Sequence, residues 1–179
     1  MGKNGMNRIT IKKISITELD TDAIVNAANS GLLAGGGVCG AIFRAAGYDE
    51  LQAACDRIGH CDTGSAVITP GFRLNAKYII HAVGPIWNGG TDGEPELLYS
   101  AYRKSLNLVM EKGCHSIGFP LISAGIYGYP VQKAWEQALR ACMDFIEKNK
   151  DYGIDIIFAV LSGEIMDIGN KTLEKMKQE

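Results

Sequence analysis

The chain has little net charge, no long hydrophobic run and no paired cysteine motif. Its 179 residues carry a formal net charge of −2, so we expect no long-range attraction to nucleic acid or to an anionic membrane. No apolar stretch is long enough to span a bilayer. These absences argue against nucleic acid and membranes as partners.

Cysteine usage indicates a reducing, cytoplasmic setting. The 5 cysteines are an odd number at irregular spacing, and no signal peptide precedes them. Cys55, His60 and Cys61 lie close together, but they contain no CxxC pair and no second pair follows. Ordinary packing is therefore favoured over a zinc site, and the sequence predicts neither a metal ion nor another cofactor.

Length and composition are typical of a globular protein. Hydrophobic residues make up 46% of the chain and charged residues 21%, and 179 residues predict one domain spanning 1–179. Residues 1–7 are polar and are predicted to be a disordered leader.

Strand-like segments alternate with helical ones along the chain. Apolar and β-branched runs predict strands at 8–14, 23–27, 65–69, 78–83, 116–120 and 154–161. Helical periodicity predicts helices at 38–46, 50–58, 94–109, 131–146 and 166–177. The alternation predicts an α/β fold, a three-layer α/β/α sandwich with a central mixed, mostly parallel sheet.

Two glycine-rich segments each follow a predicted strand and precede a predicted helix. The first is 35–40 (GGGVCG) and the second is 123–130 (SAGIYGYP). Glycine lets backbone N–H groups approach a ligand closely, and a helix start adds a positive dipole end. Ligands of such sheets bind at the carboxyl ends of strands. The two loops therefore predict a cradle for a nucleotide diphosphate, although neither matches GxGxxG or a lysine-containing phosphate loop.

Several polar and aromatic residues near these loops have two interpretations. The Asn29 amide could bond to ribose hydroxyls, or it could cap its own backbone in an Asx-turn. Tyr127 could stack beside a ribose or pack on the surface. His81 lies in an apolar strand and is predicted to be a core residue rather than a base. The segment 87–90 is predicted to be a mobile loop, with a lid as the alternative.

Five ordered segments resemble the macrodomain family, and most closely its MacroD-type branch, which includes bacterial O-acetyl-ADP-ribose deacetylases. They are 16–30 (ITELDTDAIVNAANS), 35–40 (GGGVCG), 45–47 (AAG), 80–85 (IHAVGP) and 123–130 (SAGIYGYP). The resemblance runs from Ile9 to the last predicted helix.

The resemblance implies an ADP-ribose site in a cleft over the sheet. Ser15 and Ile16 would border the adenine, and Asn29 and Tyr127 would frame the distal ribose. The implied diphosphate contacts are Gly36, Gly37, Val38, Ser123, Ala124, Gly125 and Ile126.

The resemblance also implies an activity. Many members hydrolyse an ester at the distal ribose with a bound water and no metal, releasing acetate or a protein carboxylate. The implied partners are ADP-ribose, its derivatives and mono-ADP-ribosylated proteins. The alternative is a reader of ADP-ribose that does not catalyse a reaction.

Three residues depart from the MacroD-type pattern. Cys39 replaces the Asp credited with orienting or activating the water, Phe43 replaces a His, and Ser15 replaces an Asp that contacts adenine. A thiol at a helix start can ionise and react, and it can equally be a small buried hydrophobe. Asn29 and Cys39 are the predicted catalytic residues, and Ser15 predicts relaxed selectivity for the base.

Overall fold

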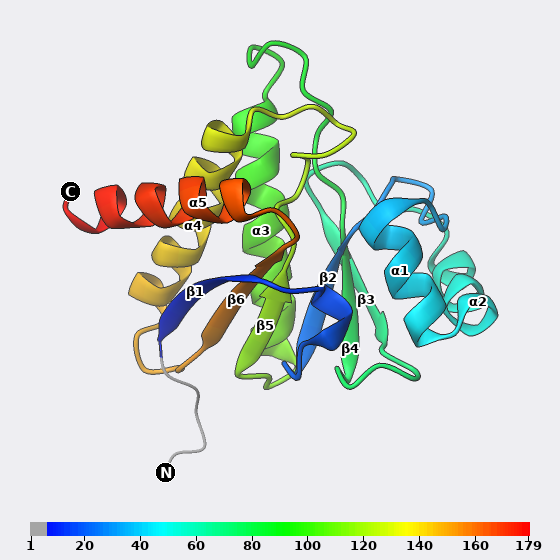
Figure 1. Cartoon of the computed structure of the whole chain (residues 1–179). Coiled ribbons are helices and arrows are strands. Elements are labelled where there is room, and N and C mark those ends of the chain that lie inside the picture. The colour runs from blue at the N-terminus through cyan, green and yellow to red at the C-terminus, as the bar shows by residue number, and fades with distance from the viewer. Residues whose placement is uncertain (1–6) are drawn as a thin grey trace.

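The computed structural model describes residues 7–179. Its six strands form one sheet in the order β1-β6-β5-β2-β4-β3 (Figure 1). The strands are β1 (Arg8–Lys13), β2 (Ala23–Ala27), β3 (Ala66–Pro70), β4 (Tyr78–Ala82), β5 (Ser116–Phe119) and β6 (Asp155–Val160). Neighbouring strands are parallel, except that β3 pairs with β4 in the antiparallel direction. The prediction of a mixed, mostly parallel sheet is confirmed.

Helices cover both faces of this sheet. They are α1 (Gly37–Ala46), α2 (Tyr48–Ile58), α3 (Glu94–Glu111), α4 (Val131–Lys148) and α5 (Gly163–Lys177), with a 3₁₀ turn η1 (Ile16–Glu18). The first two helices and η1 pack on one face, and α3, α4 and α5 pack on the other (Figure 1). The predicted three-layer α/β/α sandwich is confirmed.

The alternation of side chains along β2 shows why both faces are covered. Ala23 and Val25 belong to the core cluster under α3, α4 and α5, whereas Ile24 belongs to the cluster under α1 and α2. Successive side chains of a strand point to opposite faces. A strand whose side chains are buried on both faces therefore needs a helix layer on each side.

The start of one helix differs from the predicted start, and one short turn was not predicted. Helix α5 begins at Gly163, three residues before the predicted start, because the Ser162 hydroxyl accepts a hydrogen bond from the Ile165 N–H at 3.2 Å and caps the helix. The turn η1 escaped prediction because three residues show no helical periodicity.

The start of the described chain is held against the turn that follows α4. Asn7 donates to the Lys150 carbonyl at 2.8 Å and accepts from the Ile154 N–H at 3.1 Å, so Asn7 belongs to the folded part. The other residues of the predicted leader, 1–6, lie outside the described residues. In residues 7–179 no helix combines the length and apolar character that crossing a bilayer requires.

Candidate functional site

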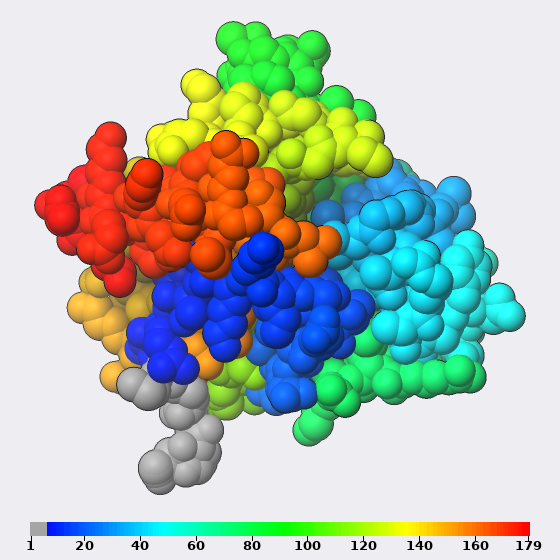
Figure 2. All heavy atoms as spheres, viewed as in Figure 1, coloured from blue at the N-terminus to red at the C-terminus, as the bar shows by residue number. Residues whose placement is uncertain are grey.

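The carboxyl ends of β2 and β5 bring the two glycine-rich loops together around a cavity of about 330 Å³, which we call the glycine-loop cavity. Figure 2 shows the corresponding hollow between the yellow-green atoms of the second loop and the blue atoms of the first. The lining comprises Ala27, Ala28, Asn29, Gly35, Gly36, Gly37, Val38, Cys39, Gly84, Pro120, Leu121, Ile122, Ser123, Gly125, Ile126 and Tyr127.

The first loop presents the amino end of α1 to this cavity. Gly36 is the N-cap of α1. The first hydrogen bond of the helix runs from the Gly40 N–H to the Gly36 carbonyl, at 3.1 Å. The N–H groups of Gly37, Val38 and Cys39 therefore have no partner within the helix. With the positive end of the helix dipole, they suit an anion.

The second loop adds a further row of backbone donors. Within residues 7–179, the N–H groups of Gly125, Ile126 and Tyr127 meet no hydrogen-bond acceptor. The Ile126 side chain is 99% exposed at the edge of the cavity, so it does not obstruct the backbone beneath it. Six backbone N–H groups without a partner in their own helix or loop thus belong to residues that line one cavity.

Three of the predicted ligand-binding residues do not line the cavity. Ala124 packs against the core beside it. Ile16 is 4% exposed in the cluster beneath η1 and α1, and the Ser15 hydroxyl lies 2.9 Å from that of Thr17. Adenine contacts by Ser15 and Ile16 therefore stay predictions.

Asn29 lines the cavity, but its side chain is engaged with its own loop. Its Nδ2 donates to the Leu33 carbonyl at 2.8 Å, and its Oδ1 accepts from the Leu33 N–H at 3.0 Å. The backbone-capping interpretation thus describes this structure. One N–H and one lone pair of the amide stay free for a ligand.

The titratable side chains in the lining are Cys39 and Tyr127, and the lining contains no carboxylate or imidazole. Cys39 is half-buried in the first turn of α1, where the sequence placed it. Phe43 is 1% exposed and packs between Tyr48 and His81, away from the cavity. Acid–base chemistry by side chains in this cavity is therefore limited to a thiol and a phenol.

His81 is a buried core residue, as predicted. Its Nδ1 lies 3.2 Å from Asn26 Nδ2, and its Nε2 lies 3.0 Å from the Thr69 hydroxyl. Burial lowers the pKa of its imidazole to about 4, so the ring is neutral at physiological pH. His81 acts in packing, not as a base.

The other cysteine and histidine candidates are dispersed. Cys55 and Cys61 are buried, and burial raises the pKa of Cys55 to about 11. His60 is exposed and pairs with Asp62 at 2.8 Å. In the part of the chain that the structure describes, no three His, Cys, Asp or Glu side chains are grouped to hold a metal ion.

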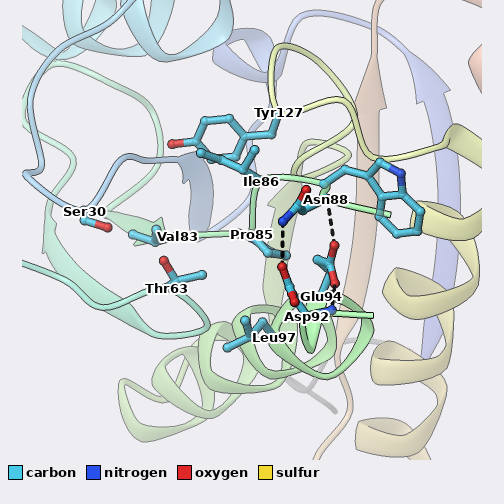
Figure 3. Close-up of a pocket in the computed structure, with 12 residues that line it drawn as sticks. Ser30, Thr63, Val83, Pro85, Ile86, Asn88, Asp92, Glu94, Leu97 and Tyr127 are labelled. Carbon is cyan, nitrogen blue, oxygen red and sulfur yellow. Dashed lines mark hydrogen bonds between the residues drawn. The ribbon is translucent and has the colours of Figure 1, made fainter. Parts of the chain in front are cut away.

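A second cavity of about 450 Å³ adjoins the first, and no sequence motif marks it. We call it the Asp92 cavity (Figure 3). It shares Gly84 and Tyr127 with the glycine-loop cavity. Its remaining lining is Ser30, Thr63, Val83, Pro85, Ile86, Trp87, Asn88, Asp92, Glu94 and Leu97.

The Glu94 carboxylate organises the loop over this second cavity. It accepts the N–H groups of Asn88, Gly90 and Asp92 at 2.7, 3.0 and 2.7 Å. Burial acts to raise the pKa of Glu94, but the backbone N–H bonds outweigh it and the pKa is lowered. The segment 87–90, predicted to be mobile, is thus fastened to the first turn of α3.

Comparison with known proteins agrees with this architecture. The Macro domain family matches residues 25–138. An O-acetyl-ADP-ribose deacetylase of Cronobacter turicensis is 52% identical over 145 residues, covering 79% of this chain and 82% of the relative. A solved Oceanobacillus iheyensis macrodomain with ADP superposes with a TM-score of 0.88 at 41% identity, covering 94% and 90% of the two chains. A Trypanosoma brucei macrodomain in complex with ADP-ribose superposes with a TM-score of 0.83 at 38% identity, covering 94% and 68%.

Proposed function

The chain belongs to the Macro domain family, and on that premise we propose that it binds ADP-ribose in the glycine-loop cavity and hydrolyses esters carried on the distal ribose. The observation that carries the proposal is the set of unpartnered backbone N–H groups in the two loops that line one cavity. A diphosphate has the charge and the acceptor oxygens to use them.

The identity of the relatives supports ADP-ribose over other anions. A macrodomain at 41% identity is solved with ADP, and another at 38% identity with ADP-ribose. In our proposal the diphosphate lies between residues 36–38 and 125–127. The ribose beyond it meets Asn29 and Tyr127, which both line the cavity.

The hydrolytic step needs a water molecule and no redox partner. The water oxygen attacks the ester carbonyl, the bond from that carbonyl carbon to the ribose oxygen breaks, and the products are a carboxylate, a proton and ADP-ribose. The lining offers amide donors and no carboxylate or imidazole to ligate a metal. We therefore assign the activation of water to positioning by Asn29 and the backbone, with Cys39 as the titratable neighbour.

A reader that binds without turnover is the second candidate. It is favoured by the engagement of both Asn29 amide atoms with Leu33 and by Cys39 in the position of the family's Asp. Such a site would hold the ligand but would orient water poorly.

For both candidates, the proposed partners are ADP-ribose derivatives and mono-ADP-ribosylated proteins. The proposed setting is cytoplasmic, in keeping with five free thiols.

Two measurements separate the candidates. Calorimetric titration with ADP-ribose tests binding, and acetate release from O-acetyl-ADP-ribose tests turnover in the wild type, Asn29→Ala and Cys39→Ala. Binding together with release that falls in Asn29→Ala supports the hydrolase. Binding with release no faster than the uncatalysed reaction leaves the reader, and no binding refutes both.

A further inference from the structure

We propose that the Asp92 cavity receives the peptide that carries ADP-ribose and favours a basic side chain beside the modified residue. This inference rests on the proposed function, because the glycine-loop cavity must first hold the ADP-ribose. It adds a subsite for the peptide and a specificity-determining residue, Asp92.

The position of the second cavity makes it the continuation of the first. The two share Gly84 and Tyr127, and Ser30 in the second directly follows Asn29 in the first. A group attached to the distal ribose beside Asn29 and Tyr127 leaves the glycine-loop cavity at this boundary. Figure 3 shows Tyr127 and Ile86 along one side of the space that such a group would enter.

The size of the cavity argues for a peptide over a small acyl group. Its volume of about 450 Å³ lies within the roughly 300–1,000 Å³ that accommodates drug-sized ligands. A two-carbon acetyl group would leave most of that space to water. A short peptide segment would fill it.

The polar groups of the lining suit an extended backbone. The hydroxyls of Ser30 and Thr63 have no hydrogen-bond partner in residues 7–179. They lie across the cavity from Asn88 and Asp92 (Figure 3). Each hydroxyl can donate to a peptide carbonyl or accept from a peptide N–H.

The charges of the lining favour a cationic group over a second phosphate-bearing unit. Asp92 and Glu94 line the cavity, and no Lys or Arg does so among the described residues. Glu94 is saturated by three backbone N–H groups. Asp92 is exposed and uses Oδ2 to accept from Asn88 Nδ2 at 2.6 Å, which leaves Oδ1 free. A free carboxylate oxygen attracts an ammonium or guanidinium group and repels a phosphate.

The test uses ADP-ribosyl peptides joined through a stable O-glycosidic bond, so that affinity is measured without turnover. One peptide has Lys beside the modified residue, and its partner has Glu at the same position. We expect the Lys peptide to bind about fivefold more tightly than the Glu peptide, as for an exposed ion pair of about 1 kcal/mol. This ratio should shrink as salt is added.

Two variants and one matched control test which residues cause the preference for the Lys peptide. Asp92→Asn removes the charge but keeps an oxygen for Asn88, so the ratio should fall to about one without disturbing the loop. Thr63→Val keeps the shape and should weaken both peptides about threefold relative to free ADP-ribose, as expected for one hydrogen bond. Asp151→Asn removes the same charge from the turn before β6, at the opposite end of the sheet, and should keep the wild-type ratio.

The outcomes distinguish the two proposals. If free ADP-ribose does not bind, the proposed function is refuted, and this inference with it. If ADP-ribose binds but the Lys and Glu peptides bind equally, or the ratio persists in Asp92→Asn, only the peptide subsite is refuted. Tighter binding of an ADP-ribose dimer than of the Lys peptide would assign the cavity to a polymer instead, and would also refute it.

Discussion

Gly84 and Ser123 lie so close together that a Cβ atom on Gly84 would overlap the Ser123 hydroxyl oxygen and the Ile122 side chain. The Ser123 hydroxyl donates to the Pro85 carbonyl at 2.7 Å, and Ser123 has a φ of 70°. The loops that follow β4 and β5 are therefore held together at Gly84, which lines both cavities.

Gly84→Ala tests this contact. Since the added methyl has no space, we expect the free energy of unfolding to fall by about 1–3 kcal/mol. ADP-ribose should also bind more weakly, because the two loops must separate. Urea denaturation and calorimetry measure these effects. Gly163→Ala, where nothing lies within 4 Å of the added Cβ, is the control and should leave both values nearly unchanged.

The buried imidazole of His81 predicts a pH dependence of stability. Burial lowers its pKa from 6.5 to about 4, so between these values the unfolded chain binds a proton that the folded chain does not. The neutral His81 ring makes its full contribution to the free energy of unfolding above pH 6.5. This contribution is lost progressively as the pH falls toward 4. At about 1.4 kcal/mol per pKa unit, the loss is about 3 kcal/mol.

Denaturation curves between pH 7 and pH 4 measure this loss. In His81→Gln the slope of stability against pH should be shallower than in the wild type, whatever the absolute stability of the variant. His60→Gln, which changes an exposed histidine, should retain the wild-type slope. Equal slopes in all three proteins would contradict the assignment to His81.

Glu94→Gln tests the fastening of the loop over the Asp92 cavity. The amide has one acceptor oxygen in place of two and carries no charge, so it cannot hold all three N–H groups. We expect faster hydrogen exchange at Asn88, Gly90 and Asp92, measured by NMR. Glu96→Gln changes an exposed glutamate in the same helical turn, and exchange there should stay as in the wild type.

Cys39 should be the thiol that reacts first in the folded protein. It is half-buried at the glycine-loop cavity, whereas the other four cysteines are buried and burial raises the pKa of each of them. A water-soluble thiol reagent should therefore modify one site per chain, and Cys39→Ser should abolish that modification. Mass spectrometry identifies the site.

Bound ADP-ribose should slow this labelling, because the ligand would cover the first turn of α1. Labelling that proceeds at the same rate with saturating ADP-ribose would contradict the proposed placement of the ligand. Labelling of Cys142 alongside Cys39 would show that the fold opens more readily than its buried cluster indicates.

The alternation of strands and helices could be predicted because β2, β4 and β6 consist mostly of apolar residues and α4 carries one buried stripe. The glycine-loop cavity could be predicted because 35–40 and 123–130 follow strands whose carboxyl ends share one edge. Periodicity and turn chemistry depend on residues that are close in the sequence, so the strands, helices and glycine-rich loops can be predicted from it.

The Asp92 cavity could not be predicted in this way. It joins Ser30, Thr63 and Asp92, which lie far apart in the chain and belong to no recognisable motif. The role of Asn29 could not be settled either, because a bond to Leu33 and a bond to a ribose need the same amide at the same position. The lining of the Asp92 cavity and the hydrogen-bond partner of Asn29 both depend on which groups lie close together in the folded chain.

Tyr127 lines both cavities, one rich in backbone N–H groups and the other containing the carboxylates of Asp92 and Glu94. A ligand with negative charge at one end and positive charge at the other is expected to place its negative end in the glycine-loop cavity and its positive end in the Asp92 cavity. This distribution of charge favours one orientation of such a ligand over the reverse one, before any bond is cleaved.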